Sequence, residues 1–79
     1  MNAVETHKGK MGGVMVFKGT RVPVRNLFDY LKAGENVKDF LEDFPSVSYK
    51  QVLDVLQEAE TIIENDGILG EKKNIHVPI

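Results

Sequence analysis

The residues best suited to chemistry form two polar groups. The first is basic and consists of Lys18, Arg21 and Arg25, whose charges suit phosphate oxygens. The second is a run of four polar residues at the expected start of a long helix: Ser48, Tyr49, Lys50 and Gln51. In helix-turn-helix proteins, the first residues of the second motif helix meet base edges in the major groove. These two groups therefore predict a DNA-binding surface.

Several of these residues also have a purely structural interpretation. Within the polar run, Gln51 has the amide that pairs with adenine, whereas Ser48 can instead be a helix cap. Tyr49 can pack inward, and Lys50 can be ordinary surface.

Arg21 has a second reading of its own. It can pair with an acid of the helical part, such as Asp29 or Asp43, instead of with phosphate.

The residues that catalysis or metal binding would need are scarce. The chain has no cysteine, which excludes disulfides and thiolate metal sites, and its histidines, His7 and His76, are far apart. The glycines at positions 9, 12 and 13 do not form a phosphate loop, because no Gly-Lys-Ser/Thr follows them at the needed spacing. We expect no cofactor, no metal site and no enzymatic activity.

The chain has 79 residues, which is enough for one small domain. A core of this size gives little stability alone, so we expect a partner subunit to add support. The net charge of −2 is distributed unevenly. Residues 1–26 contain five basic residues and one acidic residue. Residues 27–66 contain three basic and ten acidic residues, and residues 67–79 contain two basic residues and one acidic residue. A basic arm therefore adjoins an acidic body, and acid opposes DNA binding.

No apolar run is long enough for a signal peptide or a membrane span. We expect a soluble, cytoplasmic protein with no membrane partner.

The elements that must position these groups follow from local patterns. Residues 1–13 are polar and glycine-rich, and we expect a flexible basic arm with little to bury. Residues 14–67 are expected to form one domain, and residues 68–79 a C-terminal tail. The domain begins with a predicted strand at 14–17, a turn at 18–20 and a second extended segment at 21–24 that completes a hairpin. Pro23 cannot donate a ladder hydrogen bond, so the segment 21–24 is either an edge strand or a short extended lead-in.

Three helices are predicted after the hairpin. Asn26, Asn36 and Ser48 are the expected caps that begin them. Gly34 ends the first helix, Pro45 the second, and the sequence at 65–67 the third.

The third helix has two expected apolar stripes. The residues expected to face the core are Val52, Leu56, Ala59 and Ile63, with Leu53 beside them. A shorter stripe of Val55 and Ile62 is a possible contact with another chain. On the second helix, Phe40 and Phe44 are expected in the core. The predicted fold is mainly α, an N-terminal β-hairpin followed by a three-helix, helix-turn-helix bundle.

Three segments in one register resemble a known prokaryotic family. They are VFKGTRVPV (16–24), YLKAGENV (30–37) and FLEDFPSVS (40–48), followed by Val52. The sequence resembles small domains with the pattern G-T-R-[IV]-P-V … L-x-x-G-x-[ST]-[IV] … D-[FY]-P-x-[LV]-[ST], regarded as antitoxins of the VapB kind. The resemblance implies a hairpin followed by a homeodomain-like bundle, a homodimer through the N-terminal strands, and a PIN-like nuclease toxin as partner.

This chain departs from that pattern at two places. Asn36 stands where Ser or Thr is usual, and it is an equivalent cap. The residues 49–51 replace an acidic pair that is common in the family, which removes repulsion toward phosphate.

The C-terminal tail carries scattered apolar residues: Ile75, Val77 and Ile79. Antitoxins of this kind wrap their toxin with such a segment, so these residues are the predicted partner contacts. The tail can equally pack on its own bundle or stay disordered.

We therefore expect an antitoxin-like protein that binds a nuclease toxin and represses its own operon by binding operator DNA. The alternative is a protein–protein assembly module without DNA binding.

Overall fold

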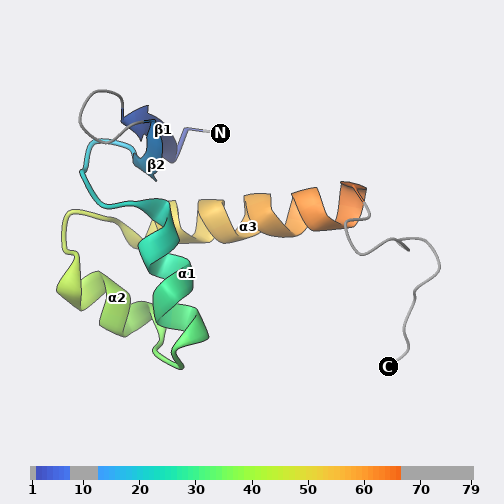
Figure 1. The fold of residues 1–79 in the computed structure, drawn as a ribbon. Helices are drawn as coiled ribbons and strands as arrows, with labels where there is room; N and C mark the ends of the chain where they lie inside the picture. Colours follow the sequence, from blue (N-terminus) through green and yellow to red (C-terminus); the bar gives the residue numbers. More distant parts are fainter. Residues whose placement is uncertain (1, 8–12, 67–79) are drawn as a thin grey trace.

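A computed structural model of the chain describes residues 2–7 and 13–66. It contains a two-stranded antiparallel hairpin followed by three helices, as the sequence predicts (Figure 1). The elements in chain order are β1 (Val4–His7), β2 (Val14–Phe17), α1 (Val24–Lys32), α2 (Val37–Asp43) and α3 (Tyr49–Asp66).

The hairpin does not use the strands that the sequence indicates. β2 is where it was expected, but its partner is β1, in a register that joins Val4 to Phe17 and His7 to Val14. For residues 21–24, the edge-strand alternative is wrong, because only an isolated bridge joins Val16 to Pro23, whereas the short extended lead-in agrees with the extended Pro23 before α1. Pro23 has no N–H to donate to a ladder, and the chain turns into α1 directly after it.

The expectation that residues 1–13 have little to bury is also wrong for the residues before β1. Ala3 is buried in the core, and its carbonyl accepts a hydrogen bond from the Lys18 N–H at 2.8 Å. The backbone therefore fastens this segment, although its side chains are mostly polar. Residues 8–12 lie outside the described residues.

Helix α1 begins three residues earlier than the sequence indicates. Pro23 is the N-cap, so Asn26 lies in the first turn, where its N–H donates to the Pro23 carbonyl, and the predicted Asn26 cap is wrong. The fixed φ of proline, here −63°, prepares the chain for the helix. Gly34 has a φ of +91° directly after the helix, which confirms its predicted role in ending it.

The starts of α2 and α3 are as predicted. The Asn36 side chain accepts from the Asp39 N–H, and Asp39 bonds back to the Asn36 N–H. At α3, the Ser48 hydroxyl accepts from the Gln51 N–H at 3.1 Å. Helix α2 ends at Asp43, two residues before Pro45, as expected, and α3 ends at Asp66.

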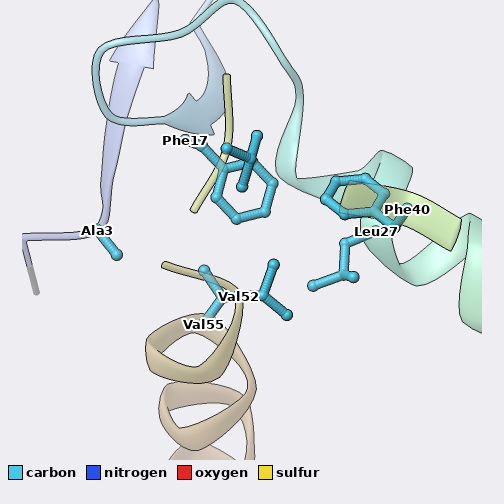
Figure 2. Packing of buried hydrophobic residues seen from close by; sticks show 7 residues of the cluster. Ala3, Phe17, Leu27, Phe40, Val52 and Val55 are labelled. Carbon is cyan, nitrogen blue, oxygen red and sulfur yellow. The ribbon is translucent and has the colours of Figure 1, made fainter. Parts of the chain in front are cut away.

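The core lies where β2 and the three helices meet, with Ala3 closing one side (Figure 2). The buried apolar residues are Ala3, Val16, Phe17, Leu27, Phe40, Val47, Val52 and Val55. Phe40 is fully buried and Phe44 is half-buried against it, which agrees with their predicted place in the core. Full burial of a side chain such as Phe40 contributes about 1.5–3 kcal/mol.

The predicted burial is wrong for two residues of α3. Val55, which was assigned to a stripe facing another chain, is only 5% exposed and belongs to the core. Ile63, which was assigned to the core, is 47% exposed. The helix is longer than the body it packs against, so its apolar stripe continues past the core (Figure 1).

Candidate functional site

Helices α2 and α3 form the helix-turn-helix that positions the predicted DNA-reading residues. The turn between them is held by Val47, which is buried and whose N–H donates to the Phe44 carbonyl at 3.0 Å. The first turn of α3, which carries the predicted DNA contacts, therefore directly follows a well-held turn. However, not all polar side chains of this first turn remain available for contact with DNA.

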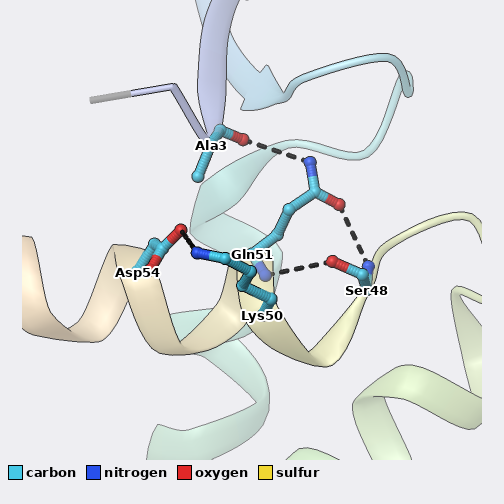
Figure 3. Close-up of polar contacts among 5 residues, drawn as sticks. All are labelled: Ala3, Ser48, Lys50, Gln51 and Asp54. Atoms are coloured by element: carbon cyan, nitrogen blue, oxygen red, sulfur yellow. Dashed lines mark hydrogen bonds and ion pairs between the residues drawn. The ribbon is translucent and has the colours of Figure 1, made fainter.

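Gln51 is committed to hydrogen bonds inside the protein (Figure 3). Its Oε1 accepts from the Ser48 N–H at 3.0 Å, and its Nε2 donates to the carbonyls of Ala3, at 3.3 Å, and Lys18, at 3.0 Å. The amide thus fastens the N-terminal segment and the β2 turn to the start of α3. The expected contact with adenine would break these bonds, so the structure gives Gln51 a structural role instead.

This role had a sequence signal. Ser48 and Gln51 are three residues apart, the spacing of a capping box in which each side chain bonds the backbone N–H of the other. Ser48 is therefore a cap, which was its alternative interpretation. The contact with Ala3, 48 residues away, had no local signal.

Tyr49 and Lys50 remain on the surface. Tyr49 is 59% exposed, so it does not pack inward. The Lys50 Nζ lies 3.1 Å from the Asp54 Oδ2, in an exposed pair one helical turn apart. Exposed pairs of this kind contribute about 0.2–1 kcal/mol, so the ammonium can leave Asp54 for another anion.

Lys18 lies in the turn after β2, Arg21 directly follows that turn, and Arg25 is the second residue of α1. Lys18, Arg21 and Arg25 are all exposed. Within residues 2–7 and 13–66, the ion pairs all involve lysines of the helices, and neither arginine takes part in one. The expected alternative for Arg21, a pair with Asp29 or Asp43, is therefore not formed.

One acid lies close to this basic group. The turn contains Gly19, with a φ of +80°, and its N–H donates to the Glu5 Oε2 at 3.0 Å. The cations of the turn thus have a carboxylate of β1 as a neighbour, which lowers their attraction for phosphate.

Tyr30 and Asp43 join α1 to α2 on another face. The Tyr30 hydroxyl donates to the Asp43 Oδ2 at 2.5 Å. This hydrogen bond is the main cause that raises the pKa of Tyr30 above its ordinary value of 10.0, followed by desolvation and by the negative charge of Asp43. The hydroxyl therefore stays protonated at neutral pH, and the pair is a link between helices.

The second half of α3, residues 57–66, forms a surface that contains Ile62, one of the two residues that the sequence indicates as a possible contact with another chain. Val55 is the last buried residue of the described chain, and beyond it Ile62 is 43% and Ile63 47% exposed. Acids accompany them: Glu58, Glu60 and Glu64 lie in this half, which contains no lysine or arginine. Apolar side chains with an acidic border are suited to a partner with a basic border.

The remaining expectations concern the C-terminal contacts, metal ions and the membrane. Ile75, Val77 and Ile79 fall outside them. In the part that the structure describes, no three His, Cys, Asp or Glu side chains come close enough to hold a metal ion. None of the described helices is both long and apolar enough to cross a membrane.

Comparison with known proteins gives one match. The model of a family described as "Protein of unknown function (DUF433)" matches residues 4–59, from the start of β1 into α3. Searches of curated proteins and of solved structures returned no match.

Proposed function

This chain belongs to the DUF433 family of proteins of unknown function, and we propose that it is an antitoxin-like protein that binds and silences a nuclease. The observation that carries this proposal is the extension of α3 beyond the core. Ile62 is exposed there, and Glu58 lies on the same side of the helix, four residues earlier. Apolar side chains held on a rigid helix can dock into a partner without a large ordering cost.

The charge of this surface favours one kind of partner. A nuclease must attract phosphate, so its substrate groove has a basic border. The acids at the end of α3 complement such a border, which speeds encounter and selects the partner. The resemblance to VapB-type antitoxins supports a PIN-like nuclease, and residues 68–79 would extend the contact from the end of the helix.

The proposal predicts a PIN-like nuclease gene beside this chain's gene, and the absence of such a gene favours an assembly module instead. The test uses the nuclease that this gene encodes. RNA cleavage by the purified nuclease is measured with and without the full chain, and inhibition is expected. Ile62→Glu should raise the concentration needed for half inhibition at least about tenfold, because a charge enters an apolar contact. The matched control is Gln57→Glu, which adds the same charge on the opposite side of α3.

Truncation after Gly67 should also weaken inhibition and leave the helical circular dichroism intact. A nuclease that is not inhibited by the full chain, or an Ile62→Glu variant that inhibits as well as Gln57→Glu, contradicts the proposal.

Operator DNA is a second candidate, favoured by the two arginines that have no acid partner among the described residues. With Gln51 engaged internally, base contacts fall to Tyr49 and Lys50, so we expect phosphate contacts to dominate and sequence preference to be weak.

Fluorescence anisotropy with DNA from upstream of the gene, measured across salt concentrations, tests this. Arg21→Ala and Arg25→Ala should each reduce the salt slope by about one. If the chain does not bind this DNA even at low salt, the DNA-binding candidate is wrong and the alternative of a protein–protein assembly module without DNA binding is favoured.

A further inference from the structure

A second apolar surface runs along α3, beside its core-facing side. We name it the outer stripe, and its apolar members are Tyr49, Leu53, Leu56 and Ile63. These positions and Glu60 follow one another at steps of four and three residues, so all five lie on one face of the helix. The stripe is about 21 Å long at the rise of an α-helix.

The outer stripe is largely uncovered by its own chain. Tyr49 is 59%, Leu53 45% and Ile63 47% exposed, and Leu56 is half-buried at the edge of the core. Of the buried residues of the helix, Val52 lies one turn before Leu56 at the edge of the stripe, and Val55 lies farther round on the core-facing side. A helix with a second apolar side of this length is suited to packing against another helix.

We propose that the outer stripe packs against the outer stripe of a second copy of this chain. The two α3 helices run antiparallel around a two-fold axis between Leu53 and Leu56. Such an interface is self-complementary, since each copy offers the same patch. This α3–α3 interface differs from the pairing of N-terminal strands that the family resemblance implies. It does not depend on the proposed nuclease partner, because we assign the nuclease contact to the side of α3 that carries Ile62.

The charges on the stripe select the second copy and its direction. Glu60 is the only charged member, and an antiparallel partner brings it next to Tyr49 and Lys50 of the other copy. The phenolic hydroxyl and the ammonium can both donate to the carboxylate. A parallel arrangement would instead place Glu60 against Glu60, which is repulsive.

The shape of the molecule allows this arrangement. The second half of α3 extends clear of the bundle (Figure 1), so the body of a second copy can lie beside it. Ile63 of each copy then covers the start of the other α3. An isolated chain of 79 residues has a small core, and this contact would add apolar burial where it is lacking.

The experiment is sedimentation equilibrium of the full chain and of charge variants, with circular dichroism to confirm folding. The wild-type chain should be dimeric. Lys50→Glu should raise the dimer dissociation constant at least about tenfold, because it places like charges at both symmetric contacts. The control is Lys38→Glu on α2, since Lys38 also forms an exposed pair one turn away, with Glu42.

Charge exchange tests the direction of the helices. In the double variant Lys50→Glu with Glu60→Lys, an antiparallel dimer regains both opposite-charge contacts, so its dissociation constant should return to near the wild-type value. A parallel dimer would gain no such rescue. Leu53→Glu, which does not depend on this charge pair, should give monomers, whereas Ile62→Glu should leave the dimer intact.

Three outcomes overturn the proposal. The first is a wild-type chain that remains monomeric at the highest soluble concentration. The second is a dimer as insensitive to Lys50→Glu and Leu53→Glu as to Lys38→Glu, which places the interface elsewhere, for example at the outer edge of β1. The third is a double variant that is no better than Lys50→Glu alone.

Discussion

The two halves of α3 both carry apolar residues at helical spacing, but the first half is packed against the core and the second half is exposed to solvent. In residues 49–56, Val52 and Val55 are buried and the Gln51 amide bonds three backbone groups. In residues 57–66, no described side chain is buried, and Ile62 and Ile63 face solvent. One helix therefore completes the core at its start and offers a surface at its end.

The two ends of α3 also differ in how well their polar and charged groups stabilise the helix. The first turn of α3 is capped by Ser48, whereas the last turn carries acids and no base. Acids near the C-terminal end of a helix are repelled by the helix dipole. A local arrangement that disfavours the helix suggests that these charges serve contact with a partner.

The largest expected effect comes from trimming one apolar residue in each half. Val52→Ala should lower the free energy of unfolding by about 2–3 kcal/mol, because it removes two buried methyl groups and leaves a cavity. Ile63→Ala should change it by less than about 0.5 kcal/mol, since the side chain is half exposed and alanine favours helix.

Urea denaturation at concentrations where the chain is monomeric measures both of these values. Equal losses for the two variants would mean that the end of α3 is covered within the monomer.

A glutamine in each half gives the next largest contrast. Gln51→Ala should cost about 1–2 kcal/mol, because it removes a cap and the donor to the Lys18 carbonyl, and it leaves the Ala3 carbonyl with only the bond from the Lys18 N–H. Gln57→Ala removes only an exposed hydrogen bond to Thr61 and should cost less than about 0.5 kcal/mol. Hydrogen exchange should show faster exchange of the β1 amides in Gln51→Ala alone.

Gln51→Glu separates the two functions of this amide. Glutamate keeps an acceptor for the Ser48 N–H but cannot donate to the two carbonyls. It should therefore preserve the start of α3 and still loosen β1. If β1 exchanges at the wild-type rate in this variant, the fastening of β1 does not depend on Gln51.

Local hydrogen-bonding chemistry explains which parts of the fold the sequence predicts well. The starts of α2 and α3 follow from Asn36 and Ser48, because a cap acts within one turn of the chain. β2 follows from its run of apolar residues. The start of α1 was missed because Asn26 is an acceptable cap, whereas the fixed φ of Pro23 begins the helix earlier.

Non-local contacts determine the features that could not be predicted from the sequence, namely the place of β1 and the burial of residues along α3. β1 contains one apolar residue, Val4, and its place depends on the ladder to β2 and on the backbone of Ala3. Periodicity likewise defines a face of α3 but not where the body beside it ends. This is why Val55 and Ile63 exchanged their expected places, whereas Ile62, which the sequence indicates as a possible contact with another chain, is exposed.

The smallest expected effect concerns the charge at the end of α3. Glu64→Lys places a cation in the last turn, where it interacts favourably with the helix dipole, and should raise the free energy of unfolding of the monomer by about 0.3–1 kcal/mol at low salt. Glu58→Lys is the control, since it makes the same charge change two turns from the end. Salt at about 1 M should remove the gain, because the Debye length falls to about 3 Å. If Glu64→Lys and Glu58→Lys stabilise the monomer equally, the gain reflects the general acidity of the body. A gain confined to Glu64→Lys would show that the end of the helix retains an acid at a local cost in stability.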